Sequence, residues 1–120
     1  MTGIKRGAVV LLRFPNTDLR TYKRRPALIV QADLPTGLNQ KIVALITSNL
    51  TRTGPTRVAV NQASQAGQEM GLRGDSVIVL DNLATVLERE IDRVIGYCPE
   101  MDTVELALCR VFGLASGRKN

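Results

Sequence analysis

Six short apolar runs rich in valine and isoleucine are the feature of this sequence that most constrains its fold. Each run has four or five residues and is bounded by glycine, proline, asparagine, aspartate or threonine, a pattern typical of strands joined by turns. Several runs are apolar without alternation, which indicates strands covered on both sides in a small barrel. Because no long helical pattern separates them, a doubly wound parallel sheet is disfavoured. The runs are Ala8–Leu12, Ala27–Val30, Ile42–Ile46, Arg57–Val60, Ser76–Leu80 and Val94–Cys98.

The end of the chain has a different periodicity. From Met101 to Leu114, apolar residues recur at three- and four-residue spacing, while Asp102, Glu105 and Arg110 fall off that stripe. This spacing predicts an amphipathic helix that ends at Gly113 or Gly117. We therefore expect a small antiparallel β-barrel with a C-terminal helix packed against it.

We expect residues 1–120 to form one domain, because a chain of 120 residues with 44% hydrophobic residues is sufficient for a single core. No apolar run approaches the roughly 20 residues that cross a bilayer. The N-terminal apolar stretch is interrupted by Arg13 and is interpreted as a first strand, not a signal peptide. The expectation is a cytoplasmic protein without a membrane contact.

Histidine is absent and only two cysteines, Cys98 and Cys109, are present, eleven positions apart. The absence of histidine removes the most common general base and metal ligand, together with every Ser-His or Cys-His nucleophile arrangement. Both cysteines lie in apolar surroundings, so we interpret them as reduced, buried and inert. We expect neither a metal site nor a cofactor.

Positive charge is concentrated in the first half of the chain. Residues 1–57 contain ten Lys and Arg against two acids, whereas residues 58–120 contain six against nine. A basic half of this strength favours a polyanionic partner, with nucleic acid as the first candidate, although basic chains of this size also occur without one.

The segment Pro15–Arg25 (PNTDLRTYKRR) is expected to be a long loop between the first two strands, with Asp18 among its turn formers. Pro26 favours an extended conformation for Arg25, which fixes that side chain at the rim. The guanidinium of Arg25 can hold two phosphate oxygens, whereas Lys23 acts as a point charge. A solvated loop explains these charges equally well.

Two further segments place polar groups at strand ends. Thr47 and Ser48 close the third run, where they either cap a turn or present hydroxyl groups near Arg25 if the second and third strands pair antiparallel. The loop Leu50–Arg57 (LTRTGPTR) is also basic and is expected at the same rim. Asp81 follows an apolar run and is either a turn cap, the more common role, or a catalytic carboxylate.

Several of these stretches together resemble the MazF/PemK/Kid family of toxin endoribonucleases from type II toxin–antitoxin pairs. The most specific element is an Arg-Pro pair before an apolar strand, followed about twenty residues later by Ile-Thr-Ser. The matching stretches are "KRGAVVLLRFPNTD", "KRRPALIVQ", "IVALITSN", "GLRGDSVIVLDNLATV" and "REIDRVIGY".

The resemblance implies an SH3-like barrel of the CcdB/Kid/MazF type that forms a homodimer and cuts single-stranded RNA without a metal, at short sequences. It places the catalytic arginine on Arg25 and the catalytic threonine on Thr47, with Asp81 as a secondary catalytic candidate. It also implies a cognate antitoxin with an acidic disordered tail. The RNA contacts that we expect are Asp18, Tyr22, Lys23, Arg24, Ser48, Asn49 and Arg52.

The chain departs from the family pattern at two positions. The glycine-rich loop with an acidic residue before the arginine is absent from "LRTYKRRP", and Val79 occupies the position of an arginine that some members pair with the aspartate matched by Asp81. An alternative function therefore stays open: a barrel that binds RNA without cutting it, or a gyrase poison like CcdB. The sequence "FGLASGRKN" lacks the aromatic-rich ending expected of the latter.

Overall fold

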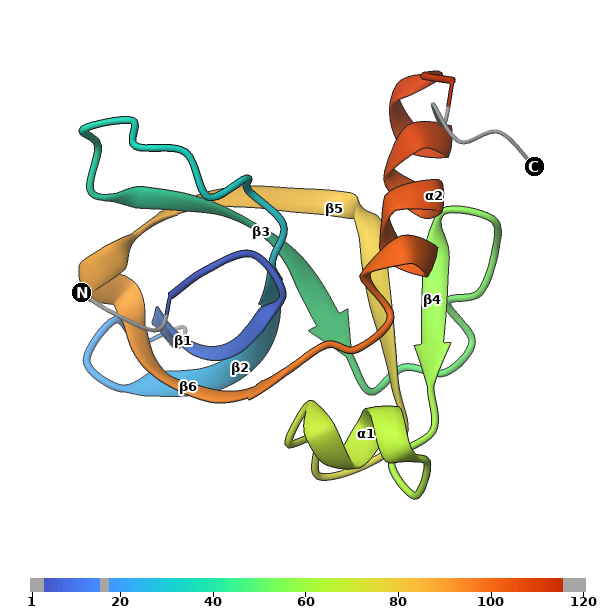
Figure 1. Cartoon of the computed structure of the whole chain (residues 1–120). Helices are drawn as coiled ribbons and strands as arrows, with labels where there is room; N and C mark the ends of the chain where they lie inside the picture. The colour runs from blue at the N-terminus through green and yellow to red at the C-terminus, as the bar shows by residue number, and fades with distance from the viewer. Residues whose placement is uncertain (1–3, 16–17, 116–120) are drawn as a thin grey trace.

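The fold is built on one antiparallel sheet of six strands with a helix packed against it (Figure 1). The computed structural model describes residues 4–15 and 18–115. Neighbouring strands follow the order β4-β5-β3-β2-β1-β6, and every pairing is antiparallel. The strands are β1 (Ala8–Pro15), β2 (Tyr22–Ile29), β3 (Gln40–Thr47), β4 (Arg57–Val60), β5 (Ser76–Leu87) and β6 (Ile91–Tyr97).

The predicted class, mainly β with a C-terminal helix, is confirmed, but the sheet does not close into a complete barrel. In Figure 1 the strands curl strongly around the N-terminal part of the chain. β6 pairs with β1 and β4 pairs with β5, so these two strands form the ends of the order. β4 has only four residues, and the C-terminal helix contacts β4 and β5 on that side.

Strand boundaries differ most in β5, which was expected to end at Leu80 and extends to Leu87. The polar residues Asp81 and Asn82 do not end the strand, because pairing with β3 resumes beyond them. Ala44 pairs with Leu83 and Leu45 pairs with Val79, which leaves an irregularity that bends the long strand. The short helix α1 (Gln65–Glu69) and the 3-10 turn η1 (Glu88–Glu90) were not predicted.

Side chains from opposite faces of the sheet form two hydrophobic clusters, as strand alternation requires. One cluster lies between the sheet and the helices and includes Leu28, Ile78 and Val104. The other lies within the curl and includes Leu12, Ala27 and Val43. The apolar runs that do not alternate in the sequence are therefore covered on both sides.

The C-terminal helix α2 (Met101–Phe112) ends at Gly113, the first of the two glycines predicted to stop it, because Gly113 adopts the left-handed conformation with φ of 66°. Val104 and Ala107 are buried against the sheet. Cys98 is buried as expected, which raises the pKa of its thiol, but Cys109 is partly exposed and not buried; neither forms a disulfide. Within residues 4–15 and 18–115, no helix has the length and apolar character needed to cross a membrane.

The connection between β1 and β2 is shorter than expected, and this changes the position of the cations. The ladder between the two strands extends to Pro15 and Tyr22, so Lys23, Arg24 and Arg25 lie on β2 and not in a loop. The Asp18 carboxylate accepts hydrogen bonds from the backbone N–H groups of Arg20 and Thr21 at 2.9 and 3.1 Å. Asn16 and Thr17, which belong to the segment expected to form the loop, lie outside the described residues.

Candidate nucleic-acid groove

The strands β2 and β3 separate at one end of the sheet and form a fork. Only three residue pairs join them, and the last is Ala27 with Leu45. If the same register is continued by two residues on each strand, Arg25 lies opposite Thr47. Alternation also places the Arg25 side chain on the same face as Ala27, and that of Thr47 on the same face as Leu45. The fork therefore brings the two predicted catalytic residues to one opening.

A groove of about 870 Å³ lies at this opening, and both Arg25 and Thr47 line it. Apolar side chains contribute to its lining, among them Leu11, Pro26 and Ile46. The lining also contains five cationic residues. Within the described chain, Asp75 contributes its one carboxylate. The cations are Lys23, Arg24, Arg25, Arg73 and Arg93.

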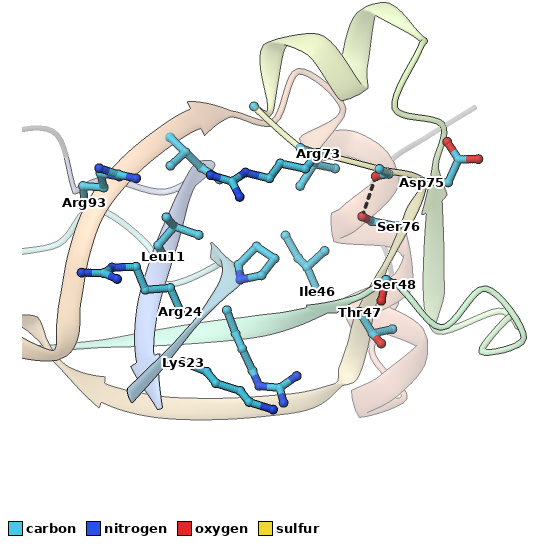
Figure 2. Close-up of a pocket in the computed structure, with 16 residues that line it drawn as sticks. Leu11, Lys23, Arg24, Ile46, Thr47, Ser48, Arg73, Asp75, Ser76 and Arg93 are labelled. Carbon is cyan, nitrogen blue, oxygen red and sulfur yellow. Dashed lines mark hydrogen bonds between the residues drawn. The ribbon is translucent and has the colours of Figure 1, made fainter. Parts of the chain in front are cut away.

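Hydroxyl groups lie at the end of β3. Thr47 closes the strand, and its Oγ1 accepts a hydrogen bond from the backbone N–H of Asn49 at 3.1 Å. Ser48 is exposed and also lines the groove. Figure 2 shows Thr47 and Ser48 right of centre, whereas Arg93 lies at the left and the guanidinium of Arg24 points to the left, away from the two hydroxyl groups. The lining of the groove thus combines arginines with two hydroxyl-bearing residues at the end of β3.

The turn before β5 carries Arg73 to the groove, and a glycine makes this possible. Gly71 has φ of 71°, and a Cβ atom there would lie 2.2 Å from the carbonyl oxygen of Ile95. The backbone of this turn therefore rests directly on β6. Asp75 in the same turn accepts a hydrogen bond from the backbone N–H of Gln62 at 2.8 Å, which fixes its carboxylate.

Asp92 organises the arginines at the other side of the groove. Its Oδ1 accepts a hydrogen bond from Arg13 and its Oδ2 accepts one from Nε of Arg24, both at 3.1 Å. The Asp92 side chain is largely covered, and the hydrogen bond from Arg13, with a second from Arg24, lowers the pKa of its carboxyl. The Nε of Arg93 lies farther from Asp92, at 3.9 Å from its Oδ2. Asp92 thus holds Arg24 through its Nε, and this hydrogen bond does not involve the terminal nitrogens of the guanidinium.

Asp81 is not one of the residues that line the groove. Its two carboxylate oxygens accept hydrogen bonds from Nε and a terminal nitrogen of Arg57 at 3.1 and 3.0 Å. The hydrogen bond from Arg57 lowers the pKa of Asp81, and the same pair raises the pKa of Arg57. The geometry joins Asp81 to the edge strand β4 and does not bring it to Arg25 and Thr47, so its catalytic role stays a prediction that this placement does not support.

The remaining predicted RNA contacts also lie outside the groove lining. Asn49 accepts hydrogen bonds from the backbone and side chain of Thr51, Arg52 is exposed in the same turn, and Asp18 caps the β1–β2 turn. The hydrogen bonds from Arg20 and Thr21 lower the pKa of Asp18. Tyr22 is 64% exposed and lines a neighbouring hollow together with Arg24.

Two arginines that the sequence analysis did not propose as RNA contacts, Arg73 and Arg93, also line the groove. Arg73 and Arg93 come from the half of the chain with an acidic balance, so charge counted along the sequence does not reveal them. The available signals were the turn "GLRGDS" and the strand "REIDRVIGY", each of which carries an exposed arginine. In the part of the chain described, no group of three or more Cys, Asp or Glu side chains could hold a metal ion.

The arrangement is suited to a polyanion that exposes a phosphate. Arg25 can donate two hydrogen bonds to phosphate oxygens, and Thr47 can donate one from its hydroxyl. The surrounding cations contribute attraction that does not depend on sequence and weakens with salt.

Comparison with known proteins gives one family. Residues 5–112 match the family described as the PemK-like, MazF-like toxin of type II toxin–antitoxin systems. No curated protein matches the chain at a significant level.

Solved structures with similar folds have consistent descriptions. The Mycobacterium tuberculosis toxin MazF-mt6 is 26% identical, with a TM-score of 0.70 over 90% of this chain and 98% of its own. A mycobacterial endoribonuclease in complex with its cognate antitoxin is 24% identical, with a TM-score of 0.70 over 92% and 96% of the two chains. MazF from the Deinococcus radiodurans MazE–MazF complex is 19% identical and shares the fold, with a TM-score of 0.68 over 92% and 96%.

Proposed function

Because the chain belongs to the PemK-like, MazF-like toxins of type II toxin–antitoxin systems, we propose that it is an endoribonuclease that cuts single-stranded RNA in the groove at the β2–β3 fork. The observation that carries this proposal is the presence of Arg25 and Thr47 in the lining of one groove rich in cations. The similar mycobacterial structures described as an endoribonuclease support it at the level of the family.

The chemistry uses the 2′-hydroxyl of the RNA as the nucleophile. A bond forms between the 2′-oxygen and phosphorus, the bond from phosphorus to the 5′-oxygen breaks, and the leaving oxygen takes a proton. The 2′-hydroxyl proton passes to a base, for which water is available at this exposed site. The proposal assigns to the protein the positioning of the phosphate and the stabilisation of its developing charge.

Arg25 is proposed as the residue that stabilises the charge on the phosphate. Its guanidinium remains protonated at any physiological pH, so it acts as an electrostatic clamp and not as a general acid. A preorganised donor of this kind contributes about 10²- to 10³-fold to the rate. Thr47 is proposed to donate its hydroxyl to a phosphate oxygen or to orient the 2′-hydroxyl, while its Oγ1 already accepts the N–H of Asn49.

Lys23, Arg24, Arg73 and Arg93 are proposed to bind the RNA backbone around the reacting phosphate. Ser48 is proposed as a neighbouring contact. The groove also suits an acidic segment of an antitoxin, because the cations that attract phosphates attract carboxylates by the same electrostatics. The homodimer and the cytoplasmic location expected from the resemblance form part of this proposal.

The test is cleavage of a long single-stranded RNA by the purified protein in EDTA, beside Arg25→Ala and Thr47→Ala. We expect cleavage by the unmodified protein in the chelator and its loss in the Arg25 variant. Arg20→Ala is the matched control, because Arg20 is exposed and lines neither described hollow. RNA binding without any cleavage by the unmodified protein would instead support a binding module on the same fold.

A further inference from the structure

A second hollow of about 660 Å³ lies next to the groove and is not needed for the chemistry proposed above. It is lined by Arg13, Tyr22, Arg24, Arg89 and Glu90, which come from β1, β2 and η1. Arg24 lines both the groove and this hollow. The groove and the second hollow therefore adjoin at Arg24.

The composition of this hollow combines an aromatic ring with three guanidinium groups. Tyr22 is 64% exposed, so most of its ring is free to contact a ligand. Exposed single aromatic residues are common, but an aromatic ring beside arginines is the combination that stacks a base and holds the adjoining phosphate.

The three guanidinium groups of the hollow outnumber the two carboxylates of this region, Glu90 and Asp92. Glu90 accepts a hydrogen bond from the backbone N–H of Leu87 at 2.7 Å, so its carboxylate is engaged with its own turn. Asp92 lies behind Arg13 and Arg24 and holds each of them by one oxygen. These two arginines are therefore oriented before any ligand arrives, which lowers the entropy cost of binding.

We propose that this hollow is a nucleotide subsite for single-stranded RNA that extends beyond the groove. Tyr22 stacks on one base, while Arg89 and Arg13 bind the backbone of that nucleotide and Asp92 acts as a positioning residue for Arg13 and Arg24. The subsite rests on the proposed function in one respect, namely that RNA occupies the groove. It makes affinity depend on RNA length, which the groove alone does not require.

The experiment measures binding of fluorescent 2′-O-methyl oligoribonucleotides of mixed sequence, which lack the hydroxyl needed for cleavage. Two lengths are compared, about four nucleotides and about twelve, which both lie within the usual site sizes of small single-strand binders. Tyr22→Leu is expected to weaken binding of the long oligonucleotide about tenfold, as the loss of one stacked base predicts, with little change for the short one. Tyr22→Phe should retain the affinity because it keeps the ring.

Arg89→Ala is expected to weaken the long oligonucleotide several-fold and to reduce its salt slope by about 0.7, the value for one phosphate of a single strand. Lys5→Ala is the control, since Lys5 is exposed and lines neither hollow. Asp92→Asn should lower affinity for the long oligonucleotide while leaving the circular-dichroism spectrum unchanged. Equal losses at both lengths in the Tyr22 and Arg89 variants would overturn the subsite. Unchanged affinity in these two variants would also overturn it, and is the result expected if the hollow binds an acidic peptide instead of RNA.

The two proposals fail differently. A protein that cuts RNA in EDTA but shows no length-dependent loss in these variants keeps the proposed function and refutes the subsite. A protein that does not cut RNA but shows the length-dependent loss refutes the nuclease and keeps the subsite.

Discussion

The groove and the β4–β5 edge both contain arginines near aspartates, but the two regions treat charge differently. At the edge, Arg57 and Asp81 match one cation with one carboxylate through two hydrogen bonds. In the groove, within the described residues, no ion pair joins Lys23, Arg25 or Arg73 to a carboxylate. Arg57 and Asp81 neutralise each other at the edge, whereas Lys23, Arg25 and Arg73 keep their charge available to a ligand in the groove.

The largest loss of RNA cleavage is expected on substitution of Arg25, and this variant tests the comparison most directly. Arg25→Ala should reduce the rate of RNA cleavage by at least about 10²-fold, because it removes the donors proposed to stabilise the reacting phosphate. Arg25→Lys should retain RNA affinity but recover only part of the rate, since an ammonium lacks the planar two-donor geometry. Initial rates at saturating protein, with affinity measured separately, check both. A normal rate in Arg25→Ala would refute the assignment.

The next effect is expected at Thr47, where a matched pair of substitutions separates shape from hydrogen bonding. Thr47→Val keeps the volume and loses the hydroxyl, and it should reduce cleavage about tenfold, the value of a hydrogen bond of roughly 1–1.5 kcal/mol. Thr47→Ser keeps the hydroxyl and should remain close to the original rate. The same rate assay applies, with thermal unfolding as the control for folding. Equal rates in the two variants would show that the hydroxyl is not used.

A smaller and different effect is expected at Arg73, which we propose binds the RNA backbone and takes no part in the reaction. Arg73→Ala should weaken RNA binding several-fold and reduce the slope of log affinity against log salt by about 0.7. The rate at saturating RNA should change little. Binding titrations at several salt concentrations measure the slope, with Arg20→Ala as the charge-matched control. A rate loss as large as that of Arg25→Ala would move Arg73 into the catalytic group.

The smallest effect on cleavage is expected at Asp81, and it distinguishes a structural pair from a catalytic one. Asp81→Asn should leave the cleavage rate within about twofold, a change of less than roughly 0.5 kcal/mol in the barrier. A loss as large as that of Arg25→Ala would restore the catalytic role that the sequence suggested for Asp81.

The same variant should change how stability depends on pH. Because Arg57 lowers the pKa of Asp81, the pair stabilises the fold above the unfolded pKa of about 3.9, and this contribution is lost as the pH falls through the lower folded value. Asp81→Asn should therefore unfold at a lower temperature near pH 7, and the difference should shrink below about pH 4. Thermal unfolding followed by circular dichroism over this range measures the effect. A difference that grows on acidification would contradict the sign.

Much of the fold could be predicted because the strand cores are apolar on both faces. The boundaries of β4 and the end of α2 at Gly113 followed directly from turn and cap residues. The continuation of β5 through Asp81 and Asn82 could not be predicted, since it depends on pairing with β3 and not on local preference. The same applies to Lys23 and Arg25, which the ladder with β1 converts from loop residues to strand residues.

The site was predictable where sequence neighbours supply it and not where the topology assembles it. Arg25 and Thr47, which both line the groove, were proposed from their strand ends and from the family resemblance. Arg73 and Arg93 reach the same groove because the turn at Gly71 rests on β6 and β6 lies beside β1. A charge count along the chain assigns both of them to an acidic half.

The fork between β2 and β3 has a consequence for control of the protein. β1 and β2 are joined by seven residue pairs and β3 and β5 by eight, but β2 and β3 by three. The spacing between Arg25 and Thr47 is therefore not fixed by a ladder of backbone hydrogen bonds. A segment that enters between the two strands can change the distance between Arg25 and Thr47 without first breaking such a ladder.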